Sequence, residues 1–68
     1  MPFAFCYPLN RVWSFSYVET IRDIAARVAQ DLRVDPEQIS FLGDSGVLLV
    51  PEDGMRVTVK CKECGSHN

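Results

Sequence analysis

Apolar and polar positions alternate with a period of two near the start of the chain. Phe3, Phe5 and Tyr7 alternate with smaller residues, and a second alternating segment covers positions 13–17. Because successive side chains of a strand point to opposite faces, each segment predicts a strand with one aromatic face. The turn-forming residues at 8–10 join the two strands into a hairpin. We expect its aromatic side to face the core and the alternate residues, Cys6 among them, to face outward.

The segment that follows predicts an amphipathic helix. Thr20 can cap its first turn through the hydroxyl, and Asp23 places a carboxylate where the helix dipole favours an anion. Apolar residues then fall on one stripe at helical spacing: Ile21, Ile24, Ala25, Val28 and Leu32. We expect this stripe to cover the aromatic face of the sheet. Pro36 excludes Val34-Asp35 from a continuing helix and predicts a short turn there.

Three more strands are predicted after the helix. Residues 39–42 alternate, the turn at 43–46 contains two glycines, and 47–50 are aliphatic. After a turn at 51–54, the last strand alternates Val57 and Val59 with polar and basic residues. The whole pattern predicts an α+β domain with one helix packed on a mixed sheet. Its outer sheet face is expected to be polar, with these short or charged residues: Ser14, Ser16, Ser40, Thr58 and Lys60.

Length and composition support a single folded domain. Sixty-eight residues suffice for one core, and a chain of this size buries only about 60% of the surface that it exposes when unfolded. Hydrophobic residues at 47% and charged residues at 24% are typical of a folded domain rather than a disordered segment. We expect the domain to span residues 1–62 and residues 63–68 to form a flexible tail.

Charge and hydropathy argue against two classes of partner, nucleic acids and membranes. Seven Lys and Arg against nine Asp and Glu leave a net charge of -2, which lacks the positive field that binds phosphate backbones. The longest aliphatic run is four residues, against roughly 20 for a membrane-spanning helix. The start of the chain lacks the basic region of a secretory signal. We therefore expect a cytoplasmic protein that binds neither nucleic acid nor membrane.

Candidate chemistry is confined to the end of the chain. Cys61 and Cys64 have the spacing of a zinc knuckle, and His67 follows them, so these three residues are candidate Zn²⁺ ligands. A fourth ligand is not evident, since Cys6 is expected on the opposite side of the sheet from Cys61, and reduced thiols in a tail are the alternative. His67 is the chain's one histidine and has no partner for nucleophilic catalysis. An enzyme is not expected.

The order of these elements resembles the ubiquitin-like superfamily over residues 3–61. The resemblance is carried by the hairpin turn at 8–10, the helix that opens at Thr20-Ile21, the link at 34–38, and the strands at 39–43 and 56–60. It implies the β-grasp fold, a β-β-α-β-β roll. Conjugated members end in Gly-Gly, whereas this chain ends in Gly65-Ser66-His67-Asn68. The resemblance therefore implies a member that is not conjugated.

Two functions remain open on the sequence. The first is a ubiquitin-like protein-interaction module with no activity of its own. Its partner would be a protein of unknown identity, bound through Leu9, Leu42, Arg56 and Lys60 on the outer sheet face, since long side chains supply most interface energy. The helix face with Arg22, Arg27 and Arg33 is the next candidate. The second function is a modifier or sulfur carrier activated at Gly65 after removal of the last three residues.

Overall fold

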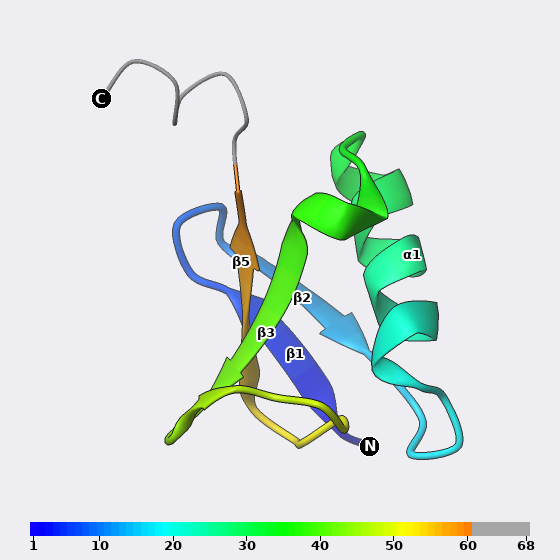
Figure 1. The fold of residues 1–68 in the computed structure, drawn as a ribbon, viewed down its shortest axis with the longest axis vertical. Helices are drawn as coiled ribbons and strands as arrows, with labels where there is room; N and C mark the ends of the chain where they lie inside the picture. Colours follow the sequence, from blue (N-terminus) through cyan, green and yellow to red (C-terminus); the bar gives the residue numbers. More distant parts are fainter. Residues whose placement is uncertain (61–68) are drawn as a thin grey trace.

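The computed structural model describes residues 1–60, and the predicted tail at 63–68 lies outside this range. Its elements, in chain order, are β1 (Phe3–Cys6), β2 (Arg11–Ser14), α1 (Ile21–Leu32), the 3-10 helix η1 (Pro36–Gln38), β3 (Ile39–Gly43), β4 (Gly46–Val47) and β5 (Met55–Val59). The five strands form one sheet in the order β2-β1-β5-β3-β4. Figure 1 labels β1, β2, β3 and β5, with α1 beside them. The pairing of β1 with β5 is parallel and the other pairs are antiparallel, so the sheet is mixed.

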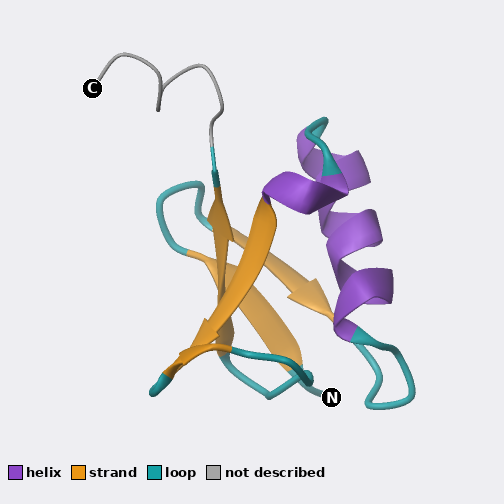
Figure 2. Ribbon diagram, viewed as in Figure 1, coloured by secondary structure: helices purple, strands orange, loops and turns teal. Residues whose placement is uncertain are grey.

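The sheet and α1 form two layers, with the helix packed across one face of the sheet (Figure 2). The predicted α+β class is therefore confirmed, and the arrangement is compatible with a β-grasp fold. The first and last long strands, β1 and β5, lie together in the middle of the sheet, which leaves β2 and β4 as its edges.

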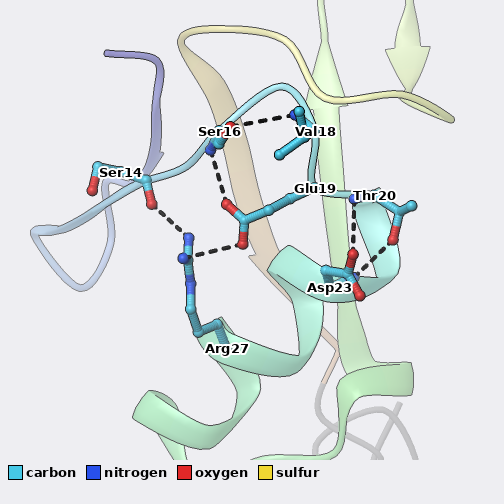
Figure 3. A network of polar contacts seen from close by, with 7 residues as sticks. All are labelled: Ser14, Ser16, Val18, Glu19, Thr20, Asp23 and Arg27. Carbon is cyan, nitrogen blue, oxygen red and sulfur yellow. Dashed lines mark hydrogen bonds and ion pairs between the residues drawn. The ribbon is translucent and has the colours of Figure 1, made fainter.

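The ends of α1 follow the predicted signals. The Thr20 hydroxyl accepts a hydrogen bond from the Asp23 amide at 3.1 Å, and the Asp23 carboxylate accepts one from the Thr20 amide at 3.1 Å (Figure 3). This reciprocal pair satisfies two amides that the first helical turn leaves unpaired. At the other end Arg33 adopts a left-handed conformation with φ of 60°, and the Val34 amide donates to the Ala29 carbonyl. Asp35 then precedes η1, where a short turn at Asp35-Pro36 was predicted.

The loop between β2 and α1 is held by a small polar network (Figure 3). The Glu19 carboxylate accepts a hydrogen bond from the Ser16 amide at 2.8 Å and pairs with the Arg27 guanidinium at 3.1 Å. Arg27 also donates to the Ser14 carbonyl at 2.5 Å. Since Ser14 ends the edge strand and Arg27 lies in mid-helix, this network fixes the position of α1 relative to β2.

The core lies between α1 and the inner face of the sheet. Its buried members are Ala4, Cys6, Phe15, Ile24, Ala25, Val28, Ala29, Ile39, Phe41, Met55 and Val57. From the predicted helix stripe, Ile24, Ala25 and Val28 are buried, and Ile21 and Leu32 pack against the core at its border. The predicted helical face is therefore confirmed.

The predicted orientation of the first strand is wrong. Ala4 and Cys6 face the core and are 0% and 3% exposed, whereas Phe3 and Tyr7 are 39% and 67% exposed. The cause is the pairing with β5, in which Ala4 lies opposite Met55 and residue 5 lies opposite Arg56. Residues paired across two strands point to the same side of a sheet, so the buried Met55 brings Ala4 inward and Arg56 keeps its neighbour outward.

The second and fourth predicted strands are shorter than expected. β2 ends at Ser14, and Phe15 enters the core while its amide donates to the Pro2 carbonyl at 3.0 Å. Tyr17 lies beyond the strand and is exposed. β4 holds two residues rather than four. The Leu48 amide still donates to the Phe41 carbonyl at 2.9 Å, and its side chain lies over Gly43, where a Cβ would be 2.7 Å from it. Leu49 and Val50 are left exposed in the loop before β5.

Candidate interaction face

The outer face of the sheet, the side that α1 does not cover, carries a row of aromatic side chains along β1. Phe3, Phe5 and Tyr7 follow one another, with ring centroids 6.3 Å apart for the first pair and 5.9 Å apart for the second. The Phe5 and Tyr7 rings are nearly parallel. Val12 on β2 lies opposite Phe5 and is 53% exposed. This outer aromatic row is therefore an apolar surface where a polar one was predicted.

A groove of about 510 Å³ adjoins the Tyr7 end of this row, on the outer side of β5. Its lining residues come from the β1–β2 turn, from β3 and from β5: Cys6, Tyr7, Pro8, Leu9, Leu42, Arg56, Val57, Thr58 and Val59. Three of the four residues predicted to bind a partner, Leu9, Leu42 and Arg56, thus line one groove. The fourth, Lys60, follows β5 and is exposed but does not line it.

The strand pairing explains why these residues lie together. Arg56 is opposite Phe5 on β1 and opposite Leu42 on β3, so all three side chains emerge on the outer face. Leu9 belongs to the turn after β1 and is 51% exposed. Neighbouring strands are about 4.8 Å apart, so long side chains at paired positions share one surface.

The electrostatics of this surface differ from those of the rest of the chain. The strands of residues 1–60 contain no Asp or Glu, and their charged residues are Arg11 and Arg56. Arg11 pairs with Asp31 of α1, whereas no ion pair to Arg56 occurs within the described part of the chain. The carboxylates of residues 1–60 lie on the helices and loops. The outer face therefore presents a cation among apolar side chains.

A second polar cluster joins the edge strand to the helix. The Asp31 carboxylate accepts hydrogen bonds from Arg11 and from the Trp13 indole, the latter at 3.0 Å, and the Arg11 guanidinium lies 5.8 Å from the Trp13 ring centre. Both charged side chains are more than 40% exposed, so the pair contributes little to stability. Each of these groups already has a partner, and we interpret the cluster as an attachment of β2 to α1.

The alternative surface on the helix is partly occupied. Arg27 is engaged with Glu19 and with the Ser14 carbonyl, whereas Arg22 and Arg33 are exposed. Hollows of similar size also adjoin the helix: Arg33 lines one of about 550 Å³ beside Leu32 and Val34, and Arg27 lines one of about 470 Å³ beside Trp13. Both of these include Asp31 in their lining, whereas the lining of the sheet groove contains no carboxylate.

The predicted zinc ligands Cys61, Cys64 and His67, and the predicted activation site Gly65, lie outside the described residues. Within residues 1–60, no group of three or more potential metal ligands comes together. Cys6 is buried in the core, on the inner rather than the outer side of the sheet as was predicted. Neither helix of the described range is long and apolar enough to cross a membrane.

Sequence reasoning missed the outer aromatic row as a candidate site. Phe3, Phe5 and Tyr7 were assigned to the core because they are the aromatic set of β1. Since the other set is also apolar, alternation alone does not say which set faces inward. The useful signal lay in β5, where Arg56 and Thr58 alternate with apolar residues and define the inner face. Combined with the parallel pairing of β1 and β5, that signal orients β1 correctly.

No family model, curated protein or solved structure gave a significant match to this chain.

Proposed function

We propose that this chain is a β-grasp, ubiquitin-like module without catalytic activity, which binds a partner protein through the outer face of its sheet. The observation that carries this proposal is the outer aromatic row beside a groove lined by Leu9 and Leu42. A contiguous exposed apolar surface of this kind is characteristic of interaction sites. Support for the β-grasp part comes from the strand order, with a parallel central pair and one helix across the inner face.

The residue types also favour a protein partner. Tyrosine and arginine are enriched among the residues that dominate interface energies, and both Tyr7 and Arg56 line the groove. Side chains that pack in rows on strands are held by their neighbours, so little conformational entropy remains to be lost on binding. The Phe5 and Tyr7 rings make such a contact, stacked with centroids 5.9 Å apart.

The test is a pair of charge reversals with equal change in net charge. Arg56→Glu with Lys60→Glu alters the outer face, and Arg22→Glu with Arg33→Glu alters the helix face. A partner isolated from lysate of the source organism should bind the first variant at least about tenfold more weakly, roughly 1.4 kcal/mol, and the second variant like the wild type. Because all four side chains are exposed, the melting temperatures should change little.

The reverse pattern, weak binding by the helix variant and normal binding by the sheet variant, would move the interaction face to α1. Equal binding by both variants and the wild type would reject both charged faces. Affinity is measured by titration calorimetry and the melting temperature by circular dichroism, so that loss of binding is separated from loss of folding.

A further inference from the structure

We infer that the partner presents to the outer face a peptide segment in which a carboxylate lies next to an apolar anchor, with the anchor in the groove and the carboxylate at Arg56. This inference rests on the proposed function and specifies the chemistry of its partner. It follows from three features of the face: the groove, the placement of Arg56, and the distribution of charge.

The groove supplies the site for the anchor. Leu9 in the β1–β2 turn and Leu42 on β3 lie on either side of β5, whose Val57 and Val59 also line the groove. Its lining extends from the β1–β2 turn across β5 to Leu42 on β3, so a segment rather than a single residue would span it. Burial of apolar surface between these walls provides the main driving force for the contact.

The placement of Arg56 selects the charge of the segment. Its cross-strand neighbours on the outer face are Phe5 and Leu42, both apolar. A partner that covers these neighbours also removes water from the guanidinium, which is costly unless a partner group accepts its hydrogen bonds. A carboxylate can accept two parallel hydrogen bonds from arginine and is the acceptor that proteins use most effectively there.

The charge distribution argues against a second copy of this chain as the occupant. A two-fold dimer through the outer faces would bring two surfaces together that have cations and no strand carboxylates. Like charges facing each other across an interface disfavour the complex. A partner that places a negative charge opposite this surface avoids that repulsion.

Single-stranded nucleic acid is the other occupant that aromatic rows suggest, since bases stack on exposed rings. Its affinity depends on how many phosphates are neutralised. Arg56 is the one strand cation of the described residues without an ion pair there, and the whole chain carries a net charge of -2. The face therefore favours one carboxylate beside an apolar group over a run of phosphates.

The experiment selects binders from a displayed library of random twelve-residue peptides. Three forms of the full chain serve as baits: the wild type, Arg56→Glu, and Arg22→Glu as the control of equal charge change on the helix. The wild type and the control should enrich peptides with Asp or Glu within three positions of a large apolar residue. The Arg56→Glu bait should lose these peptides and enrich ones with Lys or Arg at the same spacing.

The best wild-type peptide is then titrated into ¹⁵N-labelled protein. Amide shifts should concentrate at Tyr7, Leu9, Leu42 and Arg56, and replacing the acidic residue of the peptide by its amide should weaken binding at least about fivefold. Enrichment without an acidic residue, an unchanged preference for Arg56→Glu, shifts centred on α1, or a library that yields no binder would each overturn the inference.

Two further titrations distinguish the other occupants. A twelve-residue oligouridine that shifts the Phe5 and Tyr7 amides more than the peptide does, or a wild-type dimer in sedimentation that Arg56→Glu alters and Arg22→Glu does not, would also overturn the inference. The proposed function is judged separately by the natural partner and the paired charge reversals. A partner lost by the sheet variant but lacking an acidic anchor segment would retain the function and reject this chemistry.

Discussion

The two faces of strand β1 bear apolar residues of opposite size. On the inner face β1 contributes Ala4 and Cys6, and on the outer face the same strand contributes Phe3 and Phe5. Small residues inside allow α1 to approach the sheet, and the space between the layers is filled by larger side chains from other elements, including Phe15, Ile24 and Phe41. The large side chains of β1 are thus not needed for the core.

Apolar residues on the two faces therefore have different roles: those inside stabilise the fold, and those outside are available for binding. The inner face consists of residues packed to near-zero exposure around Ile24, and a change there acts on stability. On the outer face the residues around Arg56 are half-buried or exposed, apolar along β1 and polar at the paired Ser40 and Thr58, and a change there acts on binding. The comparison predicts that equivalent substitutions on the two faces have different consequences.

The largest effect is expected for a charge placed in the core. Ile24→Asp should unfold the domain, because an unpaired buried carboxylate costs several kcal/mol against a total stability of about 5 kcal/mol for a chain of this size. Ala26→Asp, two residues along the same helix on its exposed side, is the matched control and should melt cooperatively near the wild type. Thermal melts followed by circular dichroism compare them. A cooperative melt near wild type for Ile24→Asp would contradict the packing of α1 on the sheet.

A smaller effect is expected when aromatic size moves from one face to the other. Ala4→Phe should destabilise the domain by about 1–3 kcal/mol or more, since a ring at a position that is 0% exposed forces the helix outward. Phe3→Ala should cost less than about 1 kcal/mol, because the ring is already 39% exposed. Urea denaturation measures both variants. Equal costs for the two substitutions would contradict the assigned orientation of β1.

The local elements were predicted well where the signal was local. Thr20 and Asp23 fix the start of α1 by hydrogen bonds within one turn, and Pro36 limits its end, so three residues suffice to place the helix. The inner side of β5 was also predicted, because Arg56 alternates with the buried Met55 and Val57. In each case the side chain of the residue is favourable in only one local environment: a helix start, a turn or a solvent-facing strand position.

The orientation of β1 could not be predicted in this way, because both of its faces are apolar. It depends on the pairing of Ala4 with Met55, residues that are 51 positions apart in the chain. The groove has the same origin: Leu9, Leu42 and Arg56 were each chosen as long outer-face side chains, and their convergence follows from the order in which β1, β5 and β3 pair. Contacts between residues far apart in the chain cannot be predicted from the pattern of a single segment.

The most direct test of this account asks which side of β1 faces water. Two single-cysteine proteins are prepared, both with Cys61→Ser and Cys64→Ser: one retains Cys6, and the other has Cys6→Ala with Phe3→Cys. Their reaction with a water-soluble maleimide is followed by mass spectrometry under native conditions, with melts to show that both are folded. Cys6, 3% exposed, should react at least roughly a hundredfold more slowly than a cysteine at position 3, since it becomes accessible only when the domain opens. Faster reaction at Cys6 than at position 3 would show that the aromatic row lies in the core and would contradict the interaction face built on it.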